Sequence, residues 1–252
     1  MVLTDKAAIV YGGDELVGST VARAFAREGA RVFLTGRSQR GLAEVAEAVR
    51  GTGGTAEVAE VDVLDQGSVE AHAYQVASAA GGLDITVNAT AGPGTGGMLL
   101  SDMTPQDVVS PVTQAVTGHV ITAAAAARQM SRRGRGVIVT LADRLAVAPD
   151  LGGAYAAQAA LTALYRQLAC ELAPDGIRVI RLVTDGLLST PAGANGPGAA
   201  HPATATALYR PLDLGEVANV VAVLAASDLA TTMIEASFPA VSPLGGDSLF
   251  PA

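Results

Sequence analysis

The sequence predicts a single α/β domain, residues 1–252, with a doubly wound parallel sheet that carries helices on both faces. Its 252 residues suffice for one domain with a large core, and short apolar runs alternate with helical patterns along the chain. Half of the residues are hydrophobic but only 4% are aromatic, so small side chains must pack the helices closely on the sheet. Such a sheet, built with right-handed crossovers, places its ligand crevice beyond the carboxyl ends of the strands.

Apolar periodicity gives the order of the expected elements. Buried strands, with a candidate strand at the end, are expected at Ala7–Tyr11, Arg31–Thr35, Ala56–Val61, Asp84–Val87, Val137–Thr140, Ile177–Val183 and Ser237–Val241. Helices are expected after the first strand, where Val17, Val21 and Phe25 are spaced by four, and at Gly41–Arg50, 67–80, 105–133, 153–173 and Glu216–Ala226. The segment 187–211, rich in Gly, Pro and Ala, is either a flexible substrate lid or an unstructured surface loop.

Composition narrows the classes of partner. The net charge of −8 argues against binding to nucleic acid or to an anionic membrane. The small basic cluster Arg132, Arg133 and Arg135 is interpreted as a solvated helix end. The one cysteine, Cys170, excludes an intrachain disulfide and is expected to be a buried, inert thiol. Scattered histidines predict no metal site, and the lack of a visible signal peptide or membrane span predicts a cytoplasmic protein.

The turn after the first strand carries a family resemblance. Residues 11–18, YGGDELVG, resemble the Thr-Gly-x-x-x-Gly-x-Gly fingerprint of the short-chain dehydrogenase/reductase family, with Gly12 and Gly18 retained. Glycines in such a loop allow a tight turn and let backbone N–H groups approach a pyrophosphate at a helix N-terminus. Leu16 replaces the middle glycine, and Asp14 and Glu15 add negative charge. Scaffold motifs of this family extend over residues 4–246, which implies its Rossmann-like fold.

The same resemblance implies residues that surround a dinucleotide. Arg37 stands where family members grip the 2′-phosphate of NADPH, the alternative being a solvated loop residue. Asp62 and Val63 match the pair beside the adenine, although Asp62 is also suited to capping the next helix. Asn88 begins a degraded form of the Asn-Asn-Ala-Gly turn that borders the cofactor. NADPH is therefore favoured over NADH if a dinucleotide binds, and the alternative is no cofactor.

The catalytic relay of the family is altered at every position. Members usually reduce carbonyls through Asn, Ser, Tyr and Lys, and the lysine lowers the pKa of the tyrosine. Alignment on the flanking motifs gives Ala115 for the asparagine, Ala142 and Asp143 for the serine, Ala154 for the tyrosine and Gln158 for the lysine. The chain has a single lysine, Lys6, at the start of the first strand, so no lysine fills the role.

Four residues are candidates for the chemistry instead. Tyr155 adjoins the expected tyrosine position and has Gln158 one turn further on, although a neutral glutamine cannot lower a phenol pKa as an ammonium does; the alternative for Tyr155 is a packing residue. Asp143 follows a buried strand at the carboxyl edge of the sheet, where it can act as a general acid or base, or form an ion pair or turn cap. His119 is also titratable, but a lone histidine is usually structural.

Three functions remain open at this point. The first is an atypical oxidoreductase that uses NADPH on a small, largely apolar carbonyl or enone. The second is a cofactor-independent cyclase, dehydratase or isomerase on the same scaffold, using Asp143 and His119. The third is a catalytically inactive subunit that binds a partner. Residues 215–246 resemble the closing helix, strand and Gly-Gly of the family, which implies a homodimer or homotetramer.

Overall fold

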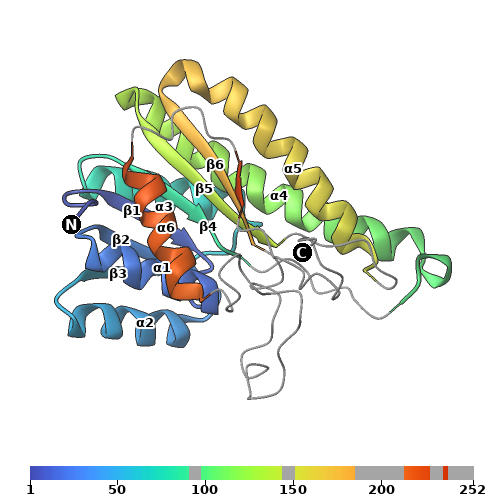
Figure 1. Cartoon of the computed structure of the whole chain (residues 1–252), viewed down its shortest axis with the longest axis horizontal. Helices are drawn as coiled ribbons and strands as arrows, with labels where there is room; N and C mark the ends of the chain where they lie inside the picture. The colour runs from blue at the N-terminus through green and yellow to red at the C-terminus, as the bar shows by residue number, and fades with distance from the viewer. Residues whose placement is uncertain (91–97, 144–150, 185–212, 228–234, 238–252) are drawn as a thin grey trace, which may run out of the picture.

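The computed structural model describes residues 1–90, 98–143, 151–184, 213–227 and 235–237. The described strands form one seven-stranded sheet in the order β3-β2-β1-β4-β5-β6-β7, and each neighbouring pair is parallel (Figure 1). The strands are β1 (Ala7–Tyr11), β2 (Arg31–Gly36), β3 (Thr55–Glu60), β4 (Ile85–Asn88), β5 (Gly136–Asp143), β6 (Ile177–Thr184) and β7 (Glu235–Ser237). The strand order reverses between β1 and β4, where a doubly wound sheet opens its ligand crevice. The predicted fold class is confirmed.

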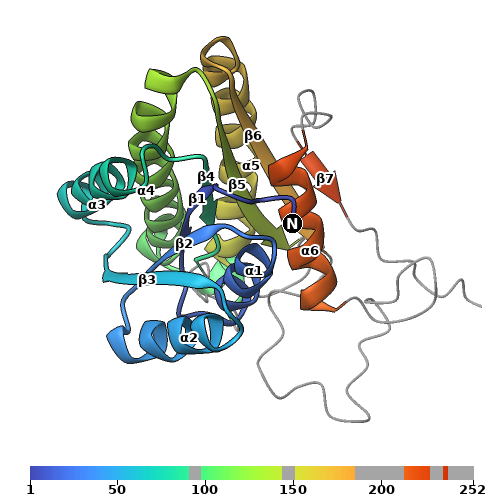
Figure 2. The same ribbon diagram turned by 90° about the vertical axis from the view of Figure 1, so that its left-hand side faces the viewer.

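Helices cover both faces of this sheet (Figure 2). They are α1 (Leu16–Arg27), α2 (Gln39–Gly51), α3 (Gln66–Ala79), α4 (Pro105–Met130), α5 (Gly153–Leu172) and α6 (Leu214–Ala226). One core cluster joins α1, α2 and α6 to strand residues such as Val10 and Leu34, and the other joins α3, α4 and α5 to Ile9 and Ile138. The alternation of Ile9 and Val10 between the two clusters follows from the two-residue period of a strand.

Local sequence explains where several helices begin. The Ser38 side chain accepts a hydrogen bond from the Gly41 amide and so caps α2. Thr104 and Asp107 form a reciprocal capping box at the start of α4, in which each side chain bonds the backbone of the other residue. Three short 3-10 helices complete the described elements, at Leu100–Asp102, Ser131–Arg133 and Ala173–Asp175.

The predicted elements are found with shifts of a few residues at their ends. β5 and β6 are longer than predicted because they pair without interruption from Gly136 opposite Ile177 to Asp143 opposite Thr184. The last strand begins earlier than predicted and shares only Ser237 with the expected range; residues 238–241 lie outside the described part. The segment 187–211, for which a lid was one expectation, also lies outside the described residues.

The prediction of a buried Cys170 is wrong, because the thiol is exposed. The buried stripe of α5 runs through Ala157, Leu161 and Tyr165 at four-residue spacing, and Cys170 falls off that stripe. Among the described residues, no helix has the length and hydropathy needed to cross a membrane.

Candidate active site

The turn between β1 and α1 is closed by two glycines for steric reasons. Gly12 has a φ of +76°, which disfavours other residues, and a Cβ added there would lie 2.9 Å from the carbonyl oxygen of Ala89. A Cβ on Gly18 would overlap the carbonyl oxygen of Gly12. Both retained glycines of the fingerprint are therefore required if α1 is to fold back against the end of β1.

This turn presents the N-terminus of α1 at the carboxyl edge of the sheet. The first N–H groups of a helix have no acceptor within the helix, and the side chain of the N-cap residue, Glu15, makes no capping hydrogen bond. Leu16, which replaces the middle glycine, has 50% of its surface exposed, so its side chain lies outside the core. The turn thus has the backbone donors that a pyrophosphate needs, and in this respect it fits a dinucleotide.

The Asp14 carboxylate lies against the backbone that follows β2, in the segment that carries Arg37. The Oδ2 atom of Asp14 accepts a hydrogen bond from the Ser38 amide at 3.0 Å. The approach is so close that a Cβ on Gly36 would overlap the Asp14 carboxylate. Arg37, between Gly36 and Ser38, is exposed. Arg37 therefore lies exposed just after β2. The Asp14 carboxylate, which the sequence pattern assigned to the pyrophosphate turn, lies beside the same segment.

The segment after β3 holds the predicted adenine pair. Asp62 is exposed, and its Oδ1 atom accepts a hydrogen bond from the Leu64 amide at 2.9 Å. The alternative interpretation of Asp62 as the cap of the next helix is wrong, because Asp65 caps α3 by accepting from the Ser68 amide. Val63 packs so closely on α4 that a Cβ on Gly118 would lie 3.1 Å from its Cγ2 atom.

Asn88, at the end of β4, ties the central strands to α4. Its Nδ2 atom donates to Thr122 Oγ1 at 3.1 Å, and its Oδ1 atom accepts from both the amide and the hydroxyl of Thr90. Thr122 in turn donates to the Gly118 carbonyl at 2.8 Å. The buried Asn88 side chain thus supports the crevice wall through hydrogen bonds inside the protein.

The predicted catalytic candidates do not form one cluster among the described side chains. Tyr155 lies in the first turn of α5 with 43% of its surface exposed, and Gln158 follows one turn later, half-buried. Asp143 is the last residue of β5, opposite Thr184 of β6, and its side chain lies outside the described part. Ala142 is buried before it. The described side chains of these candidates therefore show no proton relay.

Sequence reasoning missed the buried cation of this region, Arg181. It lies on β6 with only 6% of its surface exposed, and its Nη2 atom donates to Gln158 Oε1 at 3.0 Å. Its Nη1 atom pairs with Glu235 of β7 at 3.3 Å. Its Nε atom is buried and has no hydrogen-bond partner among the described atoms. Burial lowers the pKa of Arg181, while Glu235 raises it. One signal was available: Arg181 interrupts the apolar alternation of residues 177–184, IRVIRLVT.

His119 occupies the core between α4 and α5. Its Nδ1 atom and the hydroxyl of Tyr165 lie 2.7 Å apart, and their rings meet edge to face at 5.5 Å. Burial, with a further contribution from Arg181, lowers the pKa of His119 to about 4. Burial also raises the pKa of Tyr165. Because both groups are neutral and buried near pH 7, we interpret them as a core pair and take His119 no further as a proton donor.

Within the described ranges, no group of three or more His, Cys, Asp or Glu side chains is placed so that it could hold a metal ion. Ala115 of α4 and Ala154 of α5, at the altered relay positions, are half-buried small residues. The positions that the family resemblance assigns to the relay asparagine and tyrosine therefore carry methyl groups on these two helices.

Comparison with known proteins identifies the relatives of this fold. The protein family described as enoyl-(acyl carrier protein) reductase matches residues 15–237. An uncharacterised oxidoreductase of Bacillus subtilis, YxbG, is 31% identical over 192 residues, which cover 75% of this chain and 69% of that protein. The L-rhamnose 1-dehydrogenase (NAD(P)(+)) of Azotobacter vinelandii is 32% identical over 199 residues, which cover 75% of this chain and 76% of that enzyme.

A solved structure extends the likeness to nearly the whole chain. The crystal structure of a metagenomic short-chain oxidoreductase in complex with NADP superposes with a TM-score of 0.77 at 26% identity. The match covers 96% of this chain and 100% of the other. The NADP in that crystal is a finding about that protein.

Proposed function

The chain belongs to the short-chain dehydrogenase/reductase family, and from that premise we propose that it is an NADPH-dependent oxidoreductase acting on a small, largely apolar carbonyl or enone. The observation that carries the proposal is the glycine turn, in which Gly12 and Gly18 admit no Cβ and α1 begins at Leu16 shortly after the end of β1. The named relatives are oxidoreductases, so the cofactor-independent alternative and the inactive-subunit alternative are not favoured.

The residues available to hold the dinucleotide follow the carboxyl edge of the sheet. The turn from Gly12 to Gly18 would bind the pyrophosphate, Asp62 would accept from the adenine amine, and Val63 would pack beside that ring. A bound nicotinamide supplies the hydride that the reduction needs. Asn88 contributes by holding β4 against α4, so that the central strands keep their spacing at the crevice.

Asp14 of the glycine turn and Arg37, just after β2, would decide between NADPH and NADH. Arg37 offers an exposed guanidinium for the 2′-phosphate of NADPH. Asp14, bound to the Ser38 amide, offers instead an acceptor for the 2′-hydroxyl of NADH and repels a phosphate. We expect NADPH to bind more tightly than NADH, but only by a small factor, because the Asp14 carboxylate repels the 2′-phosphate.

Proton delivery must differ from the usual relay. Gln158 Oε1 accepts from Arg181, so the amide nitrogen is the part of Gln158 left to donate toward a cofactor ribose or a substrate oxygen. Tyr155 is exposed and its hydroxyl makes no hydrogen bond with the described residues. We assign the proton-donating role to Asp143, from its place at the end of a buried strand, with Tyr155 as the competing candidate.

Small residues at the altered relay positions guide the choice of substrate. Ala115, Ala142 and Ala154 replace larger polar side chains, which favours a ligand with more apolar bulk beside its reacting carbonyl. We also propose self-association through α4 and α5, whose exposed apolar side chains include Val109, Val120 and Tyr155.

The test is cofactor-dependent turnover. Purified protein is mixed with NADPH or NADH and a panel of apolar ketones, aldehydes and enones, and cofactor oxidation is followed by absorbance. We expect oxidation that depends on both enzyme and substrate and is faster with NADPH. Conversion of the same compounds at an undiminished rate without any dinucleotide would overturn the proposal.

A further inference from the structure

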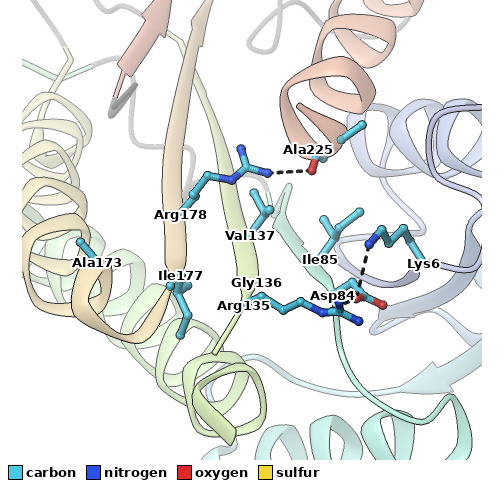
Figure 3. A pocket seen from close by; sticks show the side chains of 12 residues that line it. Lys6, Asp84, Ile85, Arg135, Gly136, Val137, Ala173, Ile177, Arg178 and Ala225 are labelled. Carbon is cyan, nitrogen blue, oxygen red and sulfur yellow. Dashed lines mark hydrogen bonds and ion pairs between the residues drawn. The ribbon is translucent and has the colours of Figure 1, made fainter. Parts of the chain in front are cut away.

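A positively charged cavity lies at the opposite edge of the sheet from the candidate active site (Figure 3). It has a volume of about 300 Å³ and is bounded by the starts of β4, β5 and β6 and by the end of α6. Its charged lining residues are Lys6, Asp84, Arg135 and Arg178, and the remaining lining residues are glycine, alanine, isoleucine and valine. The proposed function gives this cavity no role, because the dinucleotide and the relay positions lie at the carboxyl edge.

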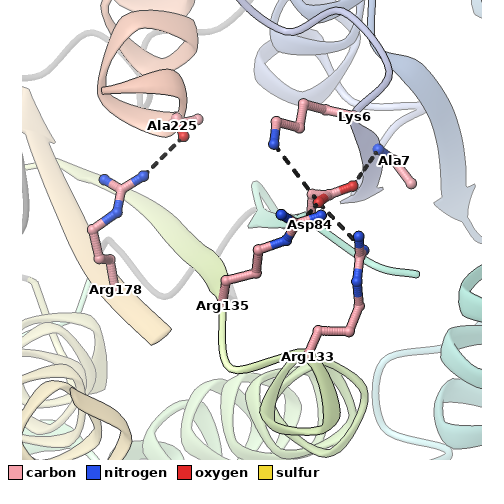
Figure 4. Close-up of polar contacts among 7 residues, drawn as sticks. All are labelled: Lys6, Ala7, Asp84, Arg133, Arg135, Arg178 and Ala225. Carbon is pink, nitrogen blue, oxygen red and sulfur yellow. Dashed lines mark hydrogen bonds and ion pairs between the residues drawn. The ribbon is translucent and has the colours of Figure 1, made fainter. Parts of the chain in front are cut away.

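Asp84 is the only acidic residue of the lining, and it faces several cations at once (Figure 4). Its Oδ2 atom accepts from the Ala7 amide at 3.0 Å. Its Oδ1 atom lies 3.4 Å from Arg133 Nη1, 3.9 Å from Lys6 Nζ and 4.0 Å from Arg135 Nε. Of these contacts, the one to Arg133 is a hydrogen bond, while Lys6 and Arg135 are held only as longer ion pairs. One carboxylate therefore leaves most of the positive charge around it uncompensated.

The interpretation of a solvated helix end is wrong for Arg133, which is half-buried against Asp84, whereas Arg135 keeps 60% of its side chain exposed. Both side chains turn back to Asp84, at the start of β4, because the chain reverses between α4 and β5. A Cβ on Gly82 would overlap the Arg133 guanidinium, so the chain before β4 leaves room for that side chain. Arg132, the remaining member of the sequence cluster, is exposed.

Arg178 supplies the other side of the cavity. Its Nη1 and Nη2 atoms donate to the carbonyls of Leu224 and Ala225 at 2.9 and 3.0 Å, which satisfies the last turn of α6. These bonds hold the guanidinium over the cavity, facing the group around Asp84 (Figure 3). On the side of the cavity around Asp84, the three cations Lys6, Arg133 and Arg135 face one carboxylate, which leaves a formal charge of +2 there in a chain whose net charge is −8.

We propose that this cavity is a binding site for a phosphate-class dianion, either inorganic phosphate or the phosphate end of a small phosphorylated metabolite. A phosphate group carries a charge of about −1.5 to −2 near pH 7 and several strong acceptor oxygens, which match the charge of the lining and its donors. Lys6 and Arg135 have 39% and 60% of their side chains exposed, so both can move from their long contacts with Asp84 onto an entering anion. Singly charged carboxylates match this charge less well.

The experiment measures thermal unfolding of the full chain as phosphate is titrated at constant ionic strength, with chloride as the balancing ion. A ligand that binds only the folded state raises the melting temperature saturably. We expect a saturable rise of several degrees in the unmodified protein. Lys6→Gln and Arg135→Gln should each lose at least half of that rise relative to their own phosphate-free melting temperature.

Two controls separate this site from others. Arg132→Gln removes a neighbouring exposed cation that does not line the cavity, and it should keep the full rise. Arg37→Gln, at the proposed dinucleotide site, should also keep it, so failure of the proposed function would not affect the result. A rise that is non-saturable, or equal in Arg135→Gln and Arg132→Gln, would overturn the proposal.

A phosphate monoester, glycerol 3-phosphate, distinguishes the two sources of the ligand. If glycerol 3-phosphate saturates the rise in melting temperature at a lower concentration than inorganic phosphate does, the site is assigned to a phosphorylated metabolite. Equal or weaker binding of the monoester assigns the site to free phosphate. Both results support the site, provided that the Lys6→Gln and Arg135→Gln variants weaken the monoester as well.

Discussion

Arg181 on β6 donates a hydrogen bond to Gln158 on α5, with 3.0 Å between Nη2 and Oε1. Gln158 stands at the position where the family resemblance places a lysine, so in this chain the cation of the region comes from the sheet instead of the helix. A lysine at 158 would now face a buried guanidinium of the same charge.

Restoring the family lysine should therefore damage the protein unless the arginine is also removed. We expect Gln158→Lys to lower the free energy of unfolding by about 1–3 kcal/mol, as close buried charges of like sign do. In an Arg181→Met background, Gln158→Lys should lower the free energy of unfolding clearly less. Urea unfolding of the two single variants and the double variant measures this coupling. An equal loss of unfolding free energy with and without Arg181 would contradict the predicted repulsion.

Stability should fall in acid because of His119. Burial lowers its pKa to about 4, whereas the unfolded chain has the ordinary value near 6.5. Between these values the unfolded state binds more protons, so stability is lost as the pH drops through this window, by roughly 3 kcal/mol in total. Urea unfolding at several pH values measures the slope.

The matched variant is His119→Gln, which removes this titration. The slope between pH 6.5 and pH 4 should become shallower in the variant. His72, whose pKa is also lowered by burial, accounts for part of the slope that remains. An unchanged pH dependence would show that His119 is accessible and not held neutral in the core.

Cofactor preference should respond in opposite directions to two changes at the end of β2. Asp14→Asn keeps an acceptor for the Ser38 amide but removes the charge, so NADPH should bind about tenfold more tightly, the effect of roughly 1.4 kcal/mol. Arg37→Gln should weaken NADPH by a similar factor and leave NADH nearly unchanged. Titration of each variant with NADPH and with NADH measures both affinities. Changes of affinity that are the same for NADPH and NADH would contradict the assignment.

Asp143 and Tyr155 can be separated by turnover. Asp143→Asn should lower kcat at least 100-fold, within the range that loss of a general acid produces. Tyr155→Phe should keep kcat within about threefold, because the exposed phenol makes no hydrogen bond with the residues that the structure describes. Asp102→Asn, on the 3-10 helix before α4, serves as a surface control. Loss of activity in Tyr155→Phe with Asp143→Asn intact would reverse the two roles.

Much of the fold could be predicted from the sequence because its signals are local. Apolar runs of strand length locate the parallel strands, and the steric need for glycine at positions 12 and 18 leaves a pattern that the structure explains atom by atom. Arg37 and Asp62 also lie just after the strands that were predicted to precede them, and both are exposed.

The buried polar contacts could not be predicted in the same way. Arg181 meets Gln158 and Glu235, which are 23 and 54 residues away, and only the packing of β6 on α5 and β7 brings them together. The same holds for Asp84 and Arg133, 49 residues apart. A charged residue in an apolar strand signals a partner, but the sequence does not say which one.

The most direct test of the central claim is binding of NADPH to the glycine turn. The chain has no tryptophan, so the fluorescence of the nicotinamide can be followed against a low background. We expect enhanced, blue-shifted emission that saturates, is abolished in Gly18→Ala, where the added Cβ overlaps the Gly12 carbonyl, and is kept in Gly51→Ala, where a Cβ meets nothing within 4 Å. Unchanged emission from NADPH and NADH up to millimolar concentrations, with the protein folded, would contradict the account.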